Sequence, residues 1–406
     1  QISMTQRNHN LALLSSAIKT YVGIDVHKSK WVISVYQDGR HVKTYAMEPC
    51  AALLISQLKG ISQGGQVFCC YEAGFSGFWL QRLLAQAGLN CEVVHAADIP
   101  STDRTQKRKT DFLDSQTLAL MLSRGLLNGI YVPSEEQEKI RGLVRSRQSM
   151  AKDKRRSMAR IRSYINRSGL VIPVEIEQKL WTQVGQKWLE ANSASDAELW
   201  VLLSSYRSNR QLEADAIKRL NNQIKSSEEY AQTQILLRSI PGVGRLTSAL
   251  LIGEIGQMDR FKNLDHLAGY CGLVPDERSS GDKTRILGLT KRRNSLLRTA
   301  LVESAWTAIR VDDELRQTYQ KALAEGKPTQ VAIIKVARRL LNRIRAVWQQ
   351  KRLYDKDRCA PGQKQLPEQQ PNRMKGFLRH GPPKSLPPNK ESQPKPAPSQ
   401  VTFQSA

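Results

Sequence analysis

Four carboxylates in the first third of the chain have the residue type and spacing of a divalent-metal site. Asp25 lies within a run of β-branched residues that predicts a strand, where a carboxylate is out of place by propensity. Glu72 ends a second short apolar run, before an Ala-Gly turn. Asp111 and Asp114 are three residues apart at the start of a predicted helix, so both face one side, near the positive end of the helix dipole.

These four side chains offer oxygen ligands and little else, which is what hard divalent cations require. Two such ions about 4 Å apart can activate a nucleophile and stabilise the leaving oxygen in phosphodiester cleavage. Each acid also has an ordinary structural explanation: Asp25 can close a turn, Glu72 can cap the next helix, and the two aspartates at the helix start can be N-cap acids. The order strand-Asp, strand-Glu, helix-DxxD is that of an RNase H-like nuclease core and favours the metal site.

A polar segment over residues 272–283, which we expect to be a loop between helices, contains adjacent serines at Ser279 and Ser280, directly before a glycine. The local sequence alone favours an ordinary turn in which one hydroxyl caps a helix. The alternative is a serine nucleophile among basic groups that bind the phosphate it attacks, namely Lys283, Arg285, Lys291, Arg292 and Arg293. A free serine hydroxyl is a poor nucleophile, and no convincing His or Asp partner is visible. Activation would have to come from the metal site, in the same or another subunit.

The elements that must position these groups begin with an α/β region. β-Branched and aromatic runs, two of them joined by an Asp-Gly pair, predict hairpin strands at 21–26, 31–36 and 41–45. Alternating helices and strands are then predicted at 48–59, 66–72, 77–87, 91–95 and 111–124, beginning and ending with a helix. Hairpin strands followed by such alternation indicate a mixed-sheet α/β domain over about 20–130.

Strand patterns vanish beyond this region. Two helical patterns at 141–167 and 212–237, with a polar break near 192–196, suggest a helical hairpin or coiled-coil arm. Ten of the 17 prolines lie in the last 48 residues, among Lys, Gln and Ser, which is typical of a disordered basic tail. We therefore predict a flexible leader at 1–20, an α/β catalytic domain at 21–133, a helical arm at 134–237, a mainly helical C-terminal domain at 238–354 and a disordered tail at 355–406.

Charge indicates the partner. The 406 residues include 62 Lys+Arg and 37 Asp+Glu, and a net charge of +25 is typical of a protein that binds a polyanion, most commonly a nucleic acid. One helical pattern is basic with almost no acids, unlike a merely solvated face, and carries Arg141, Arg145, Lys152, Arg155, Arg156 and Arg160. The turn with Gly242 and Gly244 resembles a helix-hairpin-helix turn, whose backbone N–H groups can approach a DNA phosphate.

Other classes of protein are excluded by what the sequence lacks. No stretch approaches the roughly 20 apolar residues of a membrane span, and no secretory leader pattern is visible. The six cysteines form no CxxC pair and no His-linked zinc spacing, which fits free thiols in a reducing compartment. We therefore expect a cytoplasmic protein, and the family resemblance carried by the motifs below implies a bacterial or archaeal cell and association with the nucleoid.

Five ordered motifs carry a family resemblance over about residues 20–350. They are GIDVHK at 23–28, YEAGFSG at 71–77, KTDFLDSQ at 109–116, SIPGVG at 239–244 and GLVPDERSSG at 272–281. In this order they resemble the DEDD transposases of the insertion sequence 110 family, 1111-type branch, to which Piv-like DNA invertases are related. The resemblance implies a RuvC-like domain with an RNase H fold, a coiled-coil arm and a C-terminal transposase domain.

The resemblance also implies roles for particular residues and partners. The acids Asp25, Glu72, Asp111 and Asp114 would bind Mg²⁺, for which Mn²⁺ can substitute. Ser280 would be the nucleophile that forms a covalent 5′-phosphoserine link to DNA, with Ser279 as the adjacent candidate. The protein would act on donor and target DNA as a dimer or a tetramer (a dimer of dimers), pairing the acids of one subunit with the serine of another. A structured noncoding bridge or seek RNA from the element would guide it.

The hypothesis is therefore a magnesium-dependent, RNA-guided DNA recombinase that moves its insertion element through a serine-linked intermediate. One alternative is a RuvC-like, structure-specific nuclease that uses the same acids and water. A second is a Piv-like invertase that acts on fixed sites without a guide RNA. A third is a non-catalytic RNA- and DNA-binding relative of a transposase.

Overall fold

The computed structural model describes residues 19–62, 65–99, 110–280, 283–289 and 293–355, the side chains of residues 62 and 275–289 excepted. The predicted leader, apart from its last two residues, and the predicted tail, apart from its first, lie outside the described residues. By its internal contacts the chain divides between Tyr354 and Asp355. Apart from Asp355, all described residues belong to the first of these two units.

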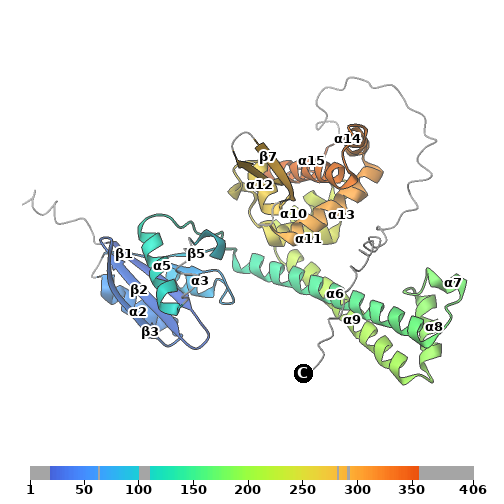
Figure 1. Cartoon of the computed structure of the whole chain (residues 1–406), viewed down its shortest axis with the longest axis horizontal. Helices are drawn as coiled ribbons and strands as arrows, with labels where there is room; N and C mark the ends of the chain where they lie inside the picture. The colour runs from blue at the N-terminus through green and yellow to red at the C-terminus, as the bar shows by residue number, and fades with distance from the viewer. Residues whose placement is uncertain (1–18, 63–64, 100–109, 281–282, 290–292, 356–406) are drawn as a thin grey trace, which may run out of the picture. The chain divides into compact units, whose positions relative to one another are not determined.

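A five-stranded mixed sheet forms the N-terminal part, in the spatial order β3-β2-β1-β4-β5 (Figure 1). The strands are β1 (Lys19–Val26), β2 (Trp31–Gln37), β3 (Arg40–Met47), β4 (Gln66–Glu72) and β5 (Asn90–Val94). β1, β2 and β3 pair antiparallel, whereas β4 runs parallel to β1, and β5 parallel to β4. Asp38 and Gly39 both have positive φ, as the predicted Asp-Gly hairpin requires. This α/β arrangement is consistent with an RNase H-like transposase fold.

Helices cover both faces of the sheet, because successive side chains along the strands point to opposite faces and are buried on both. Val22 and Ile24 of β1 lie in one buried cluster with leucines of α2 (Ala51–Ser62) and α3 (Trp79–Gln86). Cys70 of β4 points to the other face and contacts Leu118 of α5 (Asp111–Ser123). Helix α5 therefore packs on the sheet face opposite α2 and α3. The remaining short element is the 3₁₀ helix η1 (Ala96–Asp98).

Two long helices follow the sheet. α6 (Glu135–Ser168) is antiparallel to α9 (Ala197–Lys225), and α7 (Val174–Glu177) and α8 (Gln183–Ser193) lie between them in the sequence. At one end Ile140 and Ile224 share a buried cluster, and at the other Ile161 packs with Leu199. The mainly helical arm is thus present as a helix pair, and coiled-coil supercoiling stays a prediction.

The predicted single helix over 212–237 is wrong. The structure has two helices there, because α9 ends at Lys225 and α10 (Glu228–Arg238) begins after Ser226 and Ser227. Ser226 N still donates to the Asn222 carbonyl, but its neighbour Ser227 is extended and starts the next helix. The apolar periodicity continues on both sides of this break, so the pattern does not reveal it.

The C-terminal part is mainly helical. Its helices are α10, α11 (Arg245–Ile255), η2 (Met258–Arg260), α12 (Leu264–Cys271), α13 (Ser295–Val311), α14 (Asp313–Ala324) and α15 (Thr329–Gln350). They share one buried apolar cluster, to which Ile140 and Val144 of α6 also contribute. The expected loop between α12 and α13 is instead an antiparallel hairpin of β6 (Pro275–Ser280) and β7 (Lys283–Leu289). Interstrand backbone hydrogen bonds form this ladder without the long apolar alternation that would have indicated strands.

Candidate active site

The sheet places Asp25 and Glu72 on neighbouring parallel strands. The last register pair of β1 and β4 is Ile24 with Tyr71, so each acid comes directly after a paired residue at the carboxyl end of its strand. Residues at matching positions of parallel neighbours point to the same face of a sheet. Asp25 is half-buried and Glu72 is exposed. The two strands therefore bring these carboxylates to one edge of the sheet.

The absence of a side chain at Gly23 lets the helix that carries the other two acids approach this edge of the sheet. A Cβ at Gly23 would lie 2.1 Å from the Ser115 carbonyl oxygen and 2.5 Å from the Ala119 amide nitrogen. Helix α5 thus packs directly on the backbone of β1, at a distance that only glycine allows. Gly23 and Asp25 share a face of the strand, and Ser115 follows Asp114 in the helix. The first turn of α5, with Asp111 and Asp114, is thereby placed beside Asp25.

Two basic side chains that the sequence analysis left without a role complete the cluster. His27 Nε2 lies 3.1 Å from an Asp25 carboxylate oxygen and 3.5 Å from one of Asp111. Lys30 Nζ lies 2.9 Å from the other Asp111 oxygen. Both come from the turn between β1 and β2, and the histidine two residues after Asp25 in GIDVHK is the feature that could have revealed them.

The donor set fits a divalent cation. Asp25, His27 and Asp111 offer ligand atoms that all lie within 4.8 Å of one another, and this is the one such group in the described part of the chain. Glu72 and Asp114 are outside that group. Carboxylate oxygens suit both Mg²⁺ and Mn²⁺, whereas an imidazole nitrogen favours Mn²⁺ over Mg²⁺.

Electrostatics within the cluster support the same conclusion. Burial raises the pKa of Asp25 above its ordinary value; the negative charges of Asp111 and Asp114 add to the rise, and His27 opposes it. The hydrogen bond from Lys30 lowers the pKa of Asp111. Asp111 and Asp114 thus repel the negative charge of Asp25, and a bound cation would remove that repulsion.

The candidate nucleophile lies in the hairpin rather than in a loop. Ser279 pairs with Thr284 and Ser280 with Lys283, so Ser280 is the last residue of β6 before the turn. The side chains of both serines, and those of Lys283 and Arg285, lie outside the described residues, as do Lys291 and Arg292 altogether. Arg293 is described and exposed. The backbone thus presents the two serines beside the turn.

The basic residues of α6 divide into two groups. Arg145 makes a bidentate ion pair with Glu254, and Arg141 donates to the Gly253 carbonyl at 3.0 Å. These internal contacts favour a structural role for the two arginines. Farther along the helix the predicted nucleic-acid-binding residues are exposed: Lys152, Arg155, Arg156 and Arg160. Arg156 also pairs with Asp153 at 2.9 Å.

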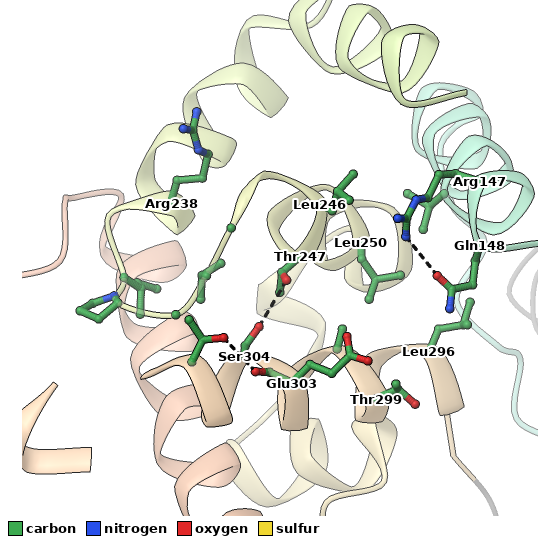
Figure 2. Close-up of a pocket in the computed structure, with 18 of the residues that line it drawn as sticks. Arg147, Gln148, Arg238, Leu246, Thr247, Leu250, Leu296, Thr299, Glu303 and Ser304 are labelled. Atoms are coloured by element: carbon green, nitrogen blue, oxygen red, sulfur yellow. Dashed lines mark hydrogen bonds between the residues drawn. The ribbon is translucent and has the colours of Figure 1, made fainter. Parts of the chain in front are cut away.

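The two glycines of the turn before α11 have different surroundings. Gly242 has a φ of +87°, and a Cβ there would lie 2.6 Å from the Ser304 carbonyl oxygen, so this glycine is required for packing on α13. A Cβ at Gly244 would meet no described atom within 4 Å. Both glycines line a cavity of about 650 Å³ with Arg147 and Arg238 (Figure 2). Gly244 is exposed and Gly242 is partly buried, and phosphate binding by either glycine stays a prediction.

No helix in the described ranges is both long and apolar enough to cross a membrane.

Two family models match the chain. Residues 22–168 match one named for the DEDD transposase of IS110 and described as a transposase. Residues 234–320 match one described as the transposase IS116/IS110/IS902 family. The first match includes the acid cluster and α6. The second includes the turn before α11 and the β6–β7 hairpin that carries Ser279 and Ser280, called the serine hairpin below.

Similar proteins carry the same description. A putative transposase, y4qE, of Sinorhizobium fredii is 32% identical over 295 residues, which cover 71% of this chain and 72% of that protein. The transposase for insertion sequence element IS1533 of Leptospira borgpetersenii is 28% identical, covering 71% and 85%. The transposase for IS1111A of Coxiella burnetii is 25% identical, covering 57% and 64%.

Proposed function

Because this chain belongs to the IS116/IS110/IS902 family of insertion-sequence transposases, we propose that its carboxylate cluster is the metal centre of a serine recombinase. DNA is the substrate of such a transposase. The observation that carries the proposal is the cluster itself, in which Asp25, His27 and Asp111 converge although Asp111 is 86 positions from Asp25. The close packing of α5 on Gly23 holds this arrangement.

The acids would hold one or two Mg²⁺ ions, which supply electrostatic stabilisation to a phosphodiester and lower the pKa of an attacking hydroxyl. Asp25 and Asp111 are the ligands best placed for this, with Glu72 and Asp114 at the same edge of the sheet. Lys30 and His27 would orient these carboxylates before binding, because their positive charges face the same oxygens.

Ser280 is proposed as the nucleophile. Its Oγ would form a bond to a DNA phosphorus while the bond from phosphorus to the 3′ oxygen breaks, and a proton would pass from the serine to the released 3′ oxygen. The product is a 5′-phosphoserine and a free 3′-hydroxyl, so no water is consumed and the bond can be rejoined. Exposed arm residues such as Lys152, Arg155 and Arg160 would bind phosphates of the nucleic acid.

The choice of site is proposed to reside in a noncoding RNA from the element, and the active form in a homo-oligomer. The family resemblance supports both proposals, and the net charge of +25 is consistent with binding of nucleic acid. In such an assembly the acids of one subunit would act on the serine of another.

Substitution of single acids tests the metal centre. Asp25→Asn and Asp114→Asn are expected to abolish strand exchange yet leave DNA binding within about threefold of wild type, because few phosphate contacts depend on these acids. The measurement is recombination between two plasmids with Mg²⁺ and guide RNA, beside filter binding of the same DNA. Asp38→Asn in the β2–β3 turn is the control. Normal recombination by either active-site variant would contradict the assignment, and hydrolysed ends from wild type would favour a water-using nuclease.

A further inference from the structure

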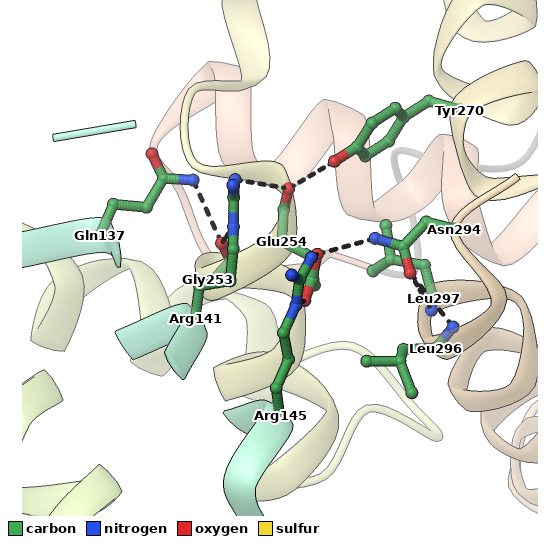
Figure 3. A network of polar contacts seen from close by, with 9 residues as sticks. All are labelled: Gln137, Arg141, Arg145, Gly253, Glu254, Tyr270, Asn294, Leu296 and Leu297. Atoms are coloured by element: carbon green, nitrogen blue, oxygen red, sulfur yellow. Dashed lines mark hydrogen bonds and ion pairs between the residues drawn. The ribbon is translucent and has the colours of Figure 1, made fainter. Parts of the chain in front are cut away.

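A buried carboxylate connects the arm helix α6 to the serine hairpin. Glu254, near the end of α11, is fully buried, and its two oxygens accept hydrogen bonds from Arg145 at 2.7 and 2.9 Å. One of these oxygens also accepts a hydrogen bond from Asn294 Nδ2 at 2.7 Å (Figure 3). A carboxylate removed from water is tolerated only with charged and hydrogen-bonded partners of this kind. Glu254 therefore fixes one residue of the arm and one residue that follows the hairpin.

The arm side of this contact extends over two further turns of α6. Gln137 Nε2 and Arg141 Nε donate to the Gly253 carbonyl oxygen at 3.1 and 3.0 Å. Carbonyls in the last turn of a helix have no partner within the helix, so these donors satisfy the end of α11. Together with Arg145, these two donors are spaced four residues apart and share one face of α6 (Figure 3). The end of α11 and this face of α6 thus form one rigid contact.

The hairpin side of the contact closes the base of the segment that carries Ser280. Asn294 N donates to the Tyr270 carbonyl oxygen at 3.0 Å, and Tyr270 Oη donates to the Glu254 carbonyl oxygen at 2.9 Å. Arg298 Nε donates to the Gly272 carbonyl oxygen at 2.7 Å. The residues before β6 and after β7 are therefore bonded to one another and to Glu254.

Asn294 also caps a helix, and one substitution can separate this role from its hydrogen bond to Glu254. Its Oδ1 accepts hydrogen bonds from Leu296 N and Leu297 N at 3.1 Å and so caps α13, while its Nδ2 reaches Glu254. A serine at this position can still cap the helix, but it has no second donor long enough to reach the carboxylate. The two roles therefore respond differently to one substitution.

We propose that Glu254 is a positioning residue that, through Arg145 and Asn294, couples the arm helix α6 to the orientation of the serine hairpin. Its functional consequence rests on the proposed serine chemistry. A displacement of the arm by bound nucleic acid reaches the hairpin base through this carboxylate, because both ends of the connection are hydrogen-bonded. Presentation of Ser280 for attack then depends on the position of the arm.

Hydrogen exchange of the full chain, without nucleic acid, tests the coupling directly. In Asn294→Ser, amides of residues 276–280 and 283–289 are expected to exchange about tenfold faster than in wild type, because the base of the hairpin opens more often. The matched control is Asn263→Ser, which changes the N-cap of α12, where Asn263 Oδ1 accepts from His266 N. Equal acceleration in both variants, or none in Asn294→Ser, would overturn the proposal.

Arg145→Lys is the second variant, useful if the serine variant folds poorly. Arg145 is half exposed, and lysine keeps the charge but cannot make two parallel hydrogen bonds to Glu254. Faster exchange at the hairpin, more than 100 residues away in the sequence, is the expected result. Unchanged exchange there would contradict the coupling.

The functional effect is a separate readout. With Mg²⁺, guide RNA and supercoiled plasmid that carries the element, Asn294→Ser is expected to form the covalent protein–DNA adduct about tenfold more slowly, with unchanged DNA affinity. An adduct rate equal to that of Asn263→Ser would reject the functional coupling while the serine mechanism stands. Absence of an adduct in wild type would reject the serine mechanism, and the exchange experiment would still judge the coupling.

Discussion

At the scale of single residues, the acid cluster is defined by what faces each carboxylate. Asp25 is half-buried among other acids, and its pKa is raised, whereas the pKa of Asp111 is lowered by Lys30. Lys30 and a divalent cation would compete for the same Asp111 oxygens, since both are positive and one of those oxygens is 2.9 Å from Nζ. In the proposed metal centre, the lysine would therefore tune how tightly the cation binds.

Lys30→Met is expected to tighten Mn²⁺ binding about three- to tenfold, because the substitution removes a positive charge a few ångströms from the incoming ion. Titration calorimetry of the full chain measures this affinity. Lys28→Met is the control, because Lys28 is an exposed lysine of the same turn. Equal affinities in the two variants would show that Lys30 does not compete with the metal.

The types and order of the residues were enough to select the four acids as candidate metal ligands. Their roles stay a proposal. His27 and Lys30 could not be assigned, because their relation to Asp111 depends on how the turn after β1 folds back toward α5. The two arginines assigned to nucleic acid, Arg141 and Arg145, have internal partners more than 100 residues away. No local pattern separates a basic residue that binds DNA from one that binds a distant buried carboxylate.

At the scale of elements, the distance between β1 and α5 determines the geometry of the site. Gly23→Ala is expected to lower recombination about 100-fold, because backbone atoms of α5 would have to move by an ångström or more and would carry Asp111 and Asp114 with them. The measurement is the rate of strand exchange at saturating Mg²⁺.

Gly60→Ala is the matched control, because a Cβ there would meet no described atom within 4 Å and the residue lies in helix α2. That variant is expected to recombine normally and to be slightly more stable, by up to about 1 kcal/mol. If Gly23→Ala recombined as well as Gly60→Ala, the close packing of α5 would not position the acids.

The α6–α9 pair contains a second buried acid whose role is structural. Burial raises the pKa of Glu213, but its ion pairs with Lys154 and Arg147, the latter at 2.7 Å, lower it below its ordinary value of 4.5. Glu213→Gln is expected to destabilise the chain by about 1–3 kcal/mol at pH 7, because it leaves two cations facing a neutral side chain. The midpoint of urea unfolding, followed by circular dichroism, measures the effect.

The sign of its pH dependence follows from the lowered pKa. A carboxylate with a lowered folded pKa contributes stability that is complete above pH 4.5 and lost as the pH falls through the folded value. The difference between wild type and Glu213→Gln should therefore shrink below pH 4.5. Asp215→Asn, an exposed position of the same helix, is the control. A difference that stayed constant with pH would contradict the ion-pair explanation.

Local patterns predicted most elements of the N-terminal sheet to within a few residues, because alternation and turn residues agree there. The predicted strand at 66–72 matches β4, and the predicted helix at 111–124 matches α5 to within one residue. The hairpin β6–β7 was missed because its polar residues resemble a loop. The break between α9 and α10 was missed because two serines interrupt the backbone without interrupting the apolar pattern.

At the scale of the whole molecule, the proposed reaction requires groups from two separate sheets. The acids belong to the five-stranded sheet and α5, and Ser280 belongs to the two-stranded sheet β6–β7. Composition predicted that the partner is a polyanion, and the family match makes it DNA. Neither composition nor local pattern predicts a long-range contact such as that between Glu254 and Arg145, which links the arm to the serine hairpin.

Trapping of the covalent intermediate tests the central claim most directly. Wild-type protein with Mg²⁺, guide RNA and plasmid DNA should give a denaturant-resistant protein–DNA adduct, which is absent in Ser280→Ala, present in Ser279→Ala and reduced at least about 100-fold in Asp25→Asn. Loss of the adduct in Ser279→Ala alone would move the nucleophile by one residue. An adduct that persists in Ser280→Ala and Ser279→Ala, or forms at the wild-type rate in Asp25→Asn, would contradict metal-assisted attack by this serine hairpin.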